Sequence, residues 1–424
     1  MARTNGYVVF VRGAVPGDRV RARVRKSKRS YAEAELVELV EPSPERVDPV
    51  AEHPGAPWQV LPYERQLAEK ESQVRDALER LGRFESAPLE PIVAGEQRTR
   101  YRNKLEYSFG TGDDGELVLG FHKTGSWELV EDVSRDLLAS ERVDGVREAV
   151  KAWCRAEGLS AWDRASGGGF LRNLVVREGR RTGQLQARLV TSQGDFQADE
   201  LAAALEDVDS VLWTRTGGVA ETTREGETKL LRGGPAIEEK LAGLRFRVSY
   251  DAFFQTNTEM AERLYGAAVE LARLSGRERV LDLYCGIGTI ALVLALDARE
   301  VYGVELVEHA VADAIENARL NGIDNASFFA GDVRTAMRPL LERSGRPDVV
   351  VVDPPRAGLS QKVIRRVLEA GADRLVYVSC NPTTLAPNAR QLVDGGYRLT
   401  AVRPVDMFPQ TPHIECVASL QRPA

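Results

Sequence analysis

Cysteine is scarce in this sequence, and the few cysteines lie far apart. Four are present among 424 residues, and no two form a C-x-x-C pair. Dispersed cysteines argue against a disulfide framework and against a thiolate zinc site. The four histidines are scattered as well, so we expect no bound metal. The cysteines are Cys154, Cys285, Cys380 and Cys416.

Long hydrophobic segments are also missing. Apolar runs such as "IALVLAL" at 290–296 fall far short of the roughly 18 residues that a membrane span needs. The first residues, "MARTNGYVVFVRG", lack the apolar core of a signal peptide. We therefore expect a cytoplasmic protein with no membrane partner.

Acidic residues outnumber basic ones, but the basic residues gather at one end. The net charge is −6, yet residues 1–30 contain nine Lys or Arg against one acid, so they carry +8. Within them, "RVRARVRK" alternates with the period of a strand. A solvated face would explain an isolated run, whereas a one-sided stripe on a small barrel favours phosphate contacts. The stripe consists of Arg19, Arg21, Arg23 and Arg25.

Four patterns follow one another along the chain. Residues 1–43, with short β-rich runs and Gly-containing turns, predict a small β-barrel. Residues 44–87 read as a proline-rich linker and a helix that packs on the catalytic domain. Residues 88–245 predict a mostly antiparallel α+β domain for substrate binding. In residues 246–424, buried-type strands alternate with helices, which predicts a doubly wound, Rossmann-like α/β domain. The expected apolar stripe of the linker helix is Leu67, Val74, Leu78 and Leu81.

A glycine loop follows the first strand of the α/β region. "VLDLYCGIGTIAL" contains Gly286-x-Gly288 between a strand and a helix, and Glu305 ends the next strand. Such glycines let the backbone approach a ligand at a helix N-terminus, and the acid can bind ribose hydroxyls. The pattern fits NAD and S-adenosylmethionine alike, and packing alone could also explain it.

The loop after the fourth strand separates these two cofactors. There "DVVVVDPPRAGL" places Asp353 and two prolines directly after a buried strand. The prolines fix a rigid loop at the carboxyl edge of the sheet, where ligands of such folds bind. A D-P-P loop is frequent in methyltransferases and is not expected of a dehydrogenase. The alternative is that Asp353 is a simple turn carboxylate.

Taken together, the motifs resemble those of the RNA 5-methyluridine methyltransferase family, which methylates carbon 5 of uracil in tRNA or large-subunit rRNA. The N-terminal "GYVVFVRGAVPGDRVRARV" resembles the TRAM RNA-binding barrel of many members, and "YRNKLEYSFG" resembles part of their central domain. The likeness covers nearly the whole chain. The motifs that carry it are "FFQTN" (253–257), "LDLYCGIGT" (281–289), "GVE" (303–305), "DPPRAGL" (353–359), "SCNPTTLA" (379–386) and "PHIECVASL" (412–420).

The resemblance implies a role for each motif. It makes Cys380 the nucleophile and Glu415 the base. It implies a structured RNA, rRNA or tRNA, as the partner, and we expect a monomer. The expected S-adenosylmethionine contacts, with the two loop glycines included, are Gln255, Tyr284, Gly286, Gly288, Glu305, Asp332 and Asp353.

The chemistry of uracil agrees with two such residues. Carbon 5 is a poor nucleophile until a thiolate adds at carbon 6, and a base must later remove the proton from carbon 5. Because Cys380 ends a strand just before a probable helix, we expect the helix N-terminus and Arg356 to lower its pKa. We expect a raised pKa for Glu415 in a closed site. His413 shares its face and is a candidate to orient it or to contact RNA. The other three cysteines are expected to be core residues.

The chain departs from the family pattern at two places. Many members bind an iron–sulfur cluster through four cysteines, but here His53, Ala56 and Asp136 stand at apparent cysteine positions. One His and one Asp cannot replace four thiolates, so we predict no cluster. Pro387-Asn388 stands where the family usually has an Arg-Asp pair; Pro387 suits the first turn of a helix, but a salt bridge made there elsewhere would be absent.

Two alternatives stay open from the sequence. One is an RNA cytosine-5 methyltransferase, which uses similar thiolate chemistry, although "SCNP" and "HIE" favour uracil. The other is a catalytically silent RNA-binding module, which would need neither Cys380 nor Glu415. The sequence does not distinguish a uridine of tRNA from one of rRNA.

Overall fold

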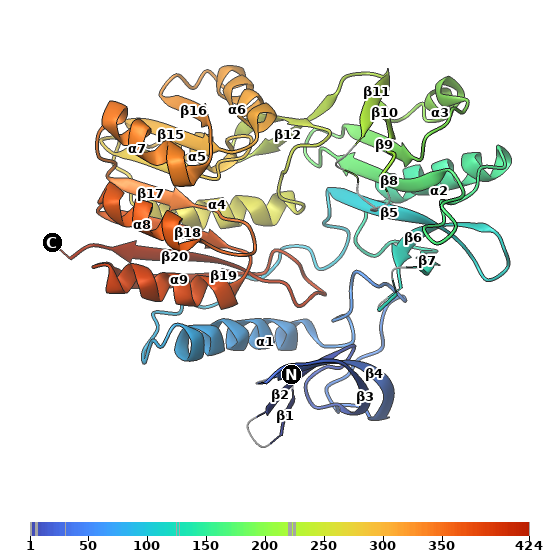
Figure 1. Cartoon of the computed structure of the whole chain (residues 1–424), viewed down its shortest axis with the longest axis horizontal. Coiled ribbons are helices and arrows are strands. Elements are labelled where there is room, and N and C mark those ends of the chain that lie inside the picture. The colour runs from blue at the N-terminus through green and yellow to red at the C-terminus, as the bar shows by residue number, and fades with distance from the viewer. Residues whose placement is uncertain are drawn as a thin grey trace.

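The computed structural model describes residues 2–423 apart from 5, 6, 30, 124, 127, 219–222, 224 and 225. Three β-rich units follow one another along the chain, and a long helix lies between the first and the third (Figure 1). No helix among the described residues is both long and apolar enough to cross a bilayer.

The N-terminal unit is a four-stranded sheet in the order β1-β2-β4-β3, in which β2 and β4 are parallel. Its β3–β4 pairing is interrupted by register shifts at three points, so the sheet is strongly distorted. The predicted small β unit is thus present. The strands are β1 (Ala2–Thr4), β2 (Tyr7–Arg12), β3 (Arg19–Ser27) and β4 (Tyr31–Glu41).

The regular arginine stripe expected on β3 is a prediction that the structure corrects. Residues 21–27 are all exposed, because the bulges twist the strand and remove the clean division into two faces. Arg21 donates to Glu38 and Arg25 to Glu35 of β4, each at 2.7 Å. Arg19 and Arg23 have no ion-pair partner in the described part of the chain. Only part of the basic strand is therefore neutralised.

The linker leads into α1 (Tyr63–Asp76) and a short π-helical turn, η1 (Ala77–Leu81). As expected, this helix packs on the catalytic domain, where Val74 and Leu78 join its core. The predicted stripe is wrong at its end, because Leu81 is 49% exposed. Two polar side chains, Gln66 and Lys70, are instead fully buried on the inner face of α1.

The central unit has a seven-stranded, mainly antiparallel sheet in the order β11-β10-β9-β8-β5-β6-β7, with β9 and β10 parallel. Two helices cover one face, and this confirms the predicted α+β pattern. Its elements are β5 (Lys104–Thr111), β6 (Leu117–His122), β7 (Val130–Asp132), α2 (Glu141–Ala156), β8 (Leu171–Glu178), β9 (Leu185–Thr191), α3 (Ala198–Ala204), β10 (Ser210–Arg215) and β11 (Glu227–Arg232).

A hairpin, β12 (Ala236–Leu241) and β13 (Leu244–Ser249), follows and spans the expected domain boundary at 245. Its apolar residues pack into the core of the C-terminal unit. Residues 89–93 likewise run along β19 of that unit through isolated bridges at Leu89 and Val93.

The C-terminal unit is the predicted doubly wound domain. Its sheet has the order β16-β15-β14-β17-β18-β20-β19, and the first five strands in that order are parallel. The core residues of α4, α5 and α6 lie together, whereas those of α7, α8, α9 and α1 form a second core. The strands are β14 (Arg279–Leu283), β15 (Glu300–Glu305), β16 (Ala326–Ala330), β17 (Val349–Val352), β18 (Arg374–Ser379), β19 (Arg398–Val405) and β20 (Glu415–Gln421). The helices are α4 (Thr258–Ala272), α5 (Thr289–Ala295), α6 (Glu308–Leu320), α7 (Val333–Ser344), α8 (Gln361–Ala370) and α9 (Pro382–Asp394).

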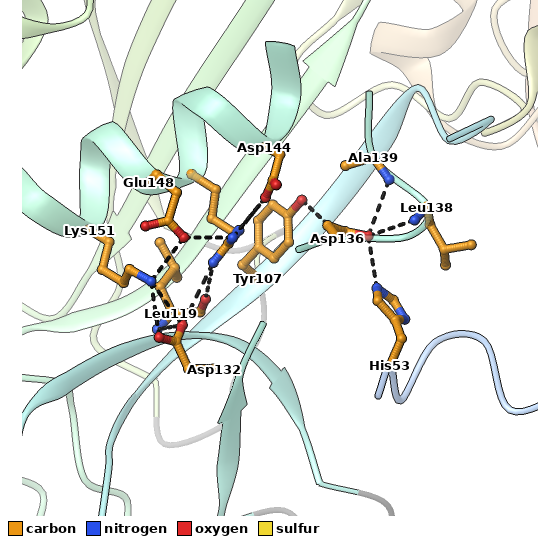
Figure 2. Close-up of polar contacts among 11 residues, drawn as sticks. His53, Tyr107, Leu119, Asp132, Asp136, Leu138, Ala139, Asp144, Glu148 and Lys151 are labelled. Atoms are coloured by element: carbon orange, nitrogen blue, oxygen red, sulfur yellow. Dashed lines mark hydrogen bonds and ion pairs between the residues drawn. The ribbon is translucent and has the colours of Figure 1, made fainter. Parts of the chain in front are cut away.

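A buried polar network joins the linker to the central unit (Figure 2). The His53 Nε2 atom lies 2.8 Å from Asp136 Oδ1, and Tyr107 donates its hydroxyl to Asp136 Oδ2 at 2.7 Å. The backbone amides of Leu138 and Ala139 donate to the same carboxylate. The side chains of His53 and Asp136 are completely inaccessible. His53 and Asp136 are 83 residues apart in the chain, and both were assigned from the sequence to apparent cysteine positions of the family pattern.

Candidate active site

Cys380 and Glu415 meet at the carboxyl edge of the parallel sheet. Cys380 directly follows β18, and Glu415 is the first residue of β20. The antiparallel pairing of these strands ends at Ser379 opposite Cys416. Continued by one position, this register sets Cys380 opposite Glu415. The thiol and the carboxyl group therefore lie close together at this edge of the sheet, although 35 residues separate them in the chain.

The pKa of Cys380 differs from the expectation. Burial of the thiol, reinforced by the negative charges of Glu415 and Asp353, raises its pKa to about 11. Arg356 acts in the opposite direction but does not compensate. The prediction of a lowered pKa is therefore wrong for the protein alone, because burial of the thiol and, second, the two neighbouring carboxyl groups outweigh the one exposed guanidinium.

Glu415 shows the raised pKa that a general base in a closed site requires. Its side chain is 4% exposed, and burial together with the charge of Asp353 raises its pKa. His413 lies two residues earlier, with its ring edge-on to Phe408 at 6.2 Å. The side of the His413 ring that packs against the protein is desolvated, and this together with the positive charges of Arg356 and Arg102 lowers its pKa, although the residue as a whole is exposed.

The remaining cysteines are core residues, as expected. Cys154, Cys285 and Cys416 are each 5% exposed or less, and burial raises the pKa of every one of them. Cys380 is the partly accessible cysteine. A thiol that reacts with a large substrate must be reachable, which distinguishes Cys380 from the other three.

The glycine loop between β14 and α5 has the open backbone of a ligand site. Tyr284, Gly286 and Gly288 all have positive φ angles, of 67°, 54° and 83°. A Cβ atom on Gly286 would meet nothing within 4 Å, so this stretch borders free space. Glu305 Oε2 accepts a hydrogen bond from the Gly286 amide at 3.1 Å. The loop and the acid thus form one rigid unit.

A group of carboxyl groups faces this loop. Burial raises the pKa of Asp353 to about 7. Asp282, which the sequence analysis missed, is fully buried in β14. Neither of its oxygens has a well-formed hydrogen bond among the described residues, although the backbone amide of Ala291 acts to lower its pKa. Burial and the charge of Asp353 outweigh this effect and raise the pKa of Asp282. The sequence did contain a signal for this residue, namely an acid inside an otherwise apolar strand. A buried carboxyl group needs a hydrogen-bond or charge partner, so such an acid is a candidate ligand-binding residue.

The other two expected cofactor residues have different surroundings. Gln255 is buried just before α4, and Asn103 donates to its backbone oxygen at 2.8 Å. Asp332 caps α7 by accepting from the Arg334 amide at 2.8 Å, and it also pairs with the Arg334 side chain. Asp332 therefore already has partners, which makes it the weakest candidate of the set.

Asn388 connects α9 to the loop after β17 by hydrogen bonds rather than by an ion pair. Its side chain accepts from the Leu359 amide at 2.8 Å and donates to the Leu359 oxygen at 3.2 Å. The end of the D-P-P loop is thereby fixed to α9 without charges. Pro387 does not lie in the first turn as expected, because Pro382 already occupies that turn and Pro387 falls inside the helix.

The family comparison decides which chemistry this site serves. The model of the tRNA (uracil-5-)-methyltransferase family matches residues 198–423, more than half of the chain. The chain belongs to this family. The TRAM domain model matches residues 1–37 of the methyltransferase.

Relatives and solved structures agree over the whole length. Uncharacterized RNA methyltransferases of Porphyromonas gingivalis and Gloeobacter violaceus are 40% and 41% identical, covering 100% and 99% of this chain and 97% and 92% of theirs. The tRNA (uracil-54, C5)-methyltransferase of Pyrococcus abyssi, solved with S-adenosyl-L-homocysteine, superposes with a TM-score of 0.80. It is 29% identical, with 98% of this chain and 96% of that chain covered. The protein is thus an S-adenosylmethionine-dependent RNA uracil-C5 methyltransferase.

Proposed function

We propose that the methyltransferase modifies uridine in a structured RNA through a covalent adduct on Cys380. The observation that carries this proposal is the strand register that sets Cys380 opposite Glu415. Addition at carbon 6 and proton removal at carbon 5 act on adjacent atoms of one ring. A nucleophile and a base on neighbouring strands therefore suit a single uracil between them.

S-adenosylmethionine fits the acidic side of the site. It supplies an electrophilic methyl group on a positively charged sulfur, and it also carries an ammonium group. Glu305, Asp353 and Asp282 offer carboxyl groups to such a cation, and a bound positive charge would lower the raised pKa values of Asp353 and Asp282. The proposed binding residues are completed by Gln255, Tyr284, Gly286, Gly288 and, less directly, Asp332.

The residues then act in a fixed order. After the Cys380 thiol has lost its proton, the thiolate forms a bond to carbon 6, and the electron pair moves onto carbon 5 as an enolate. The enolate would take the methyl group of S-adenosylmethionine, with S-adenosylhomocysteine as the leaving group. The Glu415 carboxylate next removes the proton from carbon 5. The enolate so formed expels the Cys380 thiolate, so the bond to carbon 6 breaks and 5-methyluridine is released.

The uridine must leave its stack to reach Cys380, which favours a loop or single-stranded element of tRNA or rRNA as the substrate. We propose that the TRAM unit and the central unit bind the RNA. We propose a monomer as the active form.

Methyl transfer from labelled S-adenosylmethionine to unmodified total RNA tests the reaction. We expect label in 5-methyluridine with the wild type and none with Cys380→Ala, while both bind the cofactor. The labelled RNA species identifies the substrate. Label that persists in Cys380→Ala would show that another group is the nucleophile.

We also propose that this methyltransferase contains no iron–sulfur cluster. The residues at the cluster positions do not fit one, because His53 and Asp136 hydrogen-bond to each other and Ala56 offers no ligand. No group of three or more His, Cys, Asp or Glu side chains among the described residues could hold a metal ion. The buried His53–Asp136–Tyr107 contacts provide the link between linker and central unit instead.

Iron and sulfide analysis of anaerobically purified protein tests the proposed absence of a cluster. We expect neither element, and activity that survives air and chelators. His53→Ala, which leaves the buried Asp136 carboxylate short of one partner, should lower the free energy of unfolding by about 1–3 kcal/mol. Iron and sulfide in stoichiometric amounts would overturn the proposal.

A further inference from the structure

The segment 406–414 joins β19 to β20 and delivers the proposed base. Val405 pairs with Glu415 in the antiparallel ladder, so the segment leaves and re-enters the sheet at one point. The Glu415 carboxylate has no hydrogen bond of its own among the described residues. Its position is therefore set by its backbone, which depends on β20 after it and on this segment before it.

Helix α1 holds the start of the segment through a buried ion pair. Lys70 Nζ lies 2.5 Å from Asp406 Oδ1, and both side chains are fully inaccessible. Tyr63, also on α1, donates to Asp406 Oδ2 at 2.8 Å and accepts from the Gly95 amide at 2.6 Å. This helix lies outside both family matches, at 198–423 and 1–37.

The contact continues from Lys70 toward the base. Lys70 also donates to the Phe408 carbonyl oxygen at 3.0 Å. The Thr411 hydroxyl donates to that same oxygen at 2.8 Å, and it accepts from the His413 amide at 3.2 Å. Three consecutive hydrogen bonds thus connect α1 to a residue two positions before Glu415.

Further contacts fix the middle of the segment in a strained shape. Gln410 has a φ angle of 67°, in the left-handed region that a non-glycine residue rarely adopts. Gln66 of α1 holds it with two hydrogen bonds, at 2.7 and 3.0 Å. Tyr101 donates to the Pro409 oxygen at 2.9 Å. A strained conformation persists only where its surroundings enforce it.

We propose that Tyr63, Lys70 and Asp406 are positioning residues that align Glu415 with carbon 5 of the methylated uracil. The inference rests on the proposed function, in which Glu415 removes that proton. The predicted defect is specific: thiolate addition and methyl transfer depend on Cys380 and proceed, whereas proton removal slows. The RNA then remains bonded to Cys380 through carbon 6.

Denaturing gels of the enzyme with unmodified RNA and S-adenosylmethionine test this. Tyr63→Phe removes one hydroxyl and should still fold, and Lys70→Met removes the ion pair. We expect turnover to fall by about 10- to 100-fold with an unchanged KM for S-adenosylmethionine, while methylated RNA accumulates as an adduct that survives denaturation. The adduct should increase from wild type to Tyr63→Phe to Lys70→Met.

Lys151→Met is the matched control, because Lys151 is also buried and paired, with Asp132 at 3.0 Å, but lies in the central unit (Figure 2). It should accumulate no more adduct than the wild type, even if it lowers the thermal stability of the protein. Glu415→Gln separates the two proposals. If it accumulates no adduct, the base assignment fails; if it does and Tyr63→Phe and Lys70→Met do not, only the positioning role fails.

Discussion

In the proposed mechanism, the ionisation of Cys380 controls the first bond that the methyltransferase makes. Sequence motifs identified this thiol and Glu415, because their local patterns are distinctive. They did not reveal that the thiol lies beside two carboxyl groups, since Asp353 and Glu415 come from other strands and meet Cys380 only in the folded chain. A pKa depends on those neighbours, so its direction could not be obtained from the residues adjacent to Cys380.

We predict that Cys380 reacts slowly with iodoacetamide at neutral pH. Its pKa of about 11 leaves little thiolate there, and because the thiolate is the deprotonated form, the rate should rise up to at least pH 10. Mass spectrometry of alkylated peptides measures this, with Cys380→Ala as the control for the three buried cysteines. A rate that is already maximal at pH 7 would contradict the prediction.

The Asp353 carboxyl group gives a second prediction at this scale. Its pKa is raised from 3.8 to about 7, so the buried charge lowers stability increasingly between these two pH values and most strongly above pH 7, and the cost disappears only below about pH 4. Asp353→Asn should raise the Tm at pH 8 by about 2–4 °C and weaken S-adenosylmethionine binding. Scanning calorimetry and titration calorimetry measure the two effects. At pH 5 the gain in Tm should be clearly smaller than at pH 8, because pH 5 lies between the ordinary value of 3.8 and the raised value of about 7; an equal gain at both pH values would exclude ionisation as its cause.

At the level of elements, the doubly wound architecture of the catalytic unit could be predicted from its alternating strands and helices, but the contacts of α1 could not. The pattern of apolar residues in α1 predicted a helix that packs on its neighbours mainly through leucines. Lys70 breaks that pattern and is nevertheless buried, because Asp406, 336 residues away, supplies its partner. A long-range pair of this kind leaves no local signal, and the same holds for Asn388 and the D-P-P loop.

The bulged strand β3 also gives a prediction, because its arginines are not equivalent. Arg19→Gln with Arg23→Gln removes two unpaired cations and should weaken RNA binding, with a salt slope smaller by about 0.7–0.9 per lost phosphate contact. Arg21→Gln with Arg25→Gln should have less effect, since Glu38 and Glu35 already share those charges. Filter binding from 50 to 200 mM salt compares the pairs. Equal salt slopes for the two double variants would mean that the ion pairs with Glu38 and Glu35 do not weaken the contacts of Arg21 and Arg25 with RNA.

In the whole molecule, the net positive charge and the proposed S-adenosylmethionine-binding residues lie in different units. The TRAM-containing segment 1–41 carries nine Lys or Arg and five Asp or Glu, a net charge of +4, which leaves −10 on the remaining residues. Because β4 adds four acids to the basic first 30 residues, the unit is less positive than that segment alone suggested. Asp18, with a fully buried side chain, fixes it to the linker through two 2.7 Å hydrogen bonds from Arg46.

Deletion of residues 1–41 should therefore separate RNA binding from cofactor binding. The proposed S-adenosylmethionine residues all lie beyond residue 250, and α1 remains to hold segment 406–414, so the Kd for the cofactor should not change. The Kd for RNA at 100 mM salt should rise about tenfold, because an acidic remainder must bind a polyanion without its basic unit. Full-length protein with Arg46→Gln is the control for linker damage, since it keeps every basic residue of the TRAM unit. If the deleted protein binds RNA as tightly as the full chain does, the central and catalytic units must supply the phosphate contacts themselves.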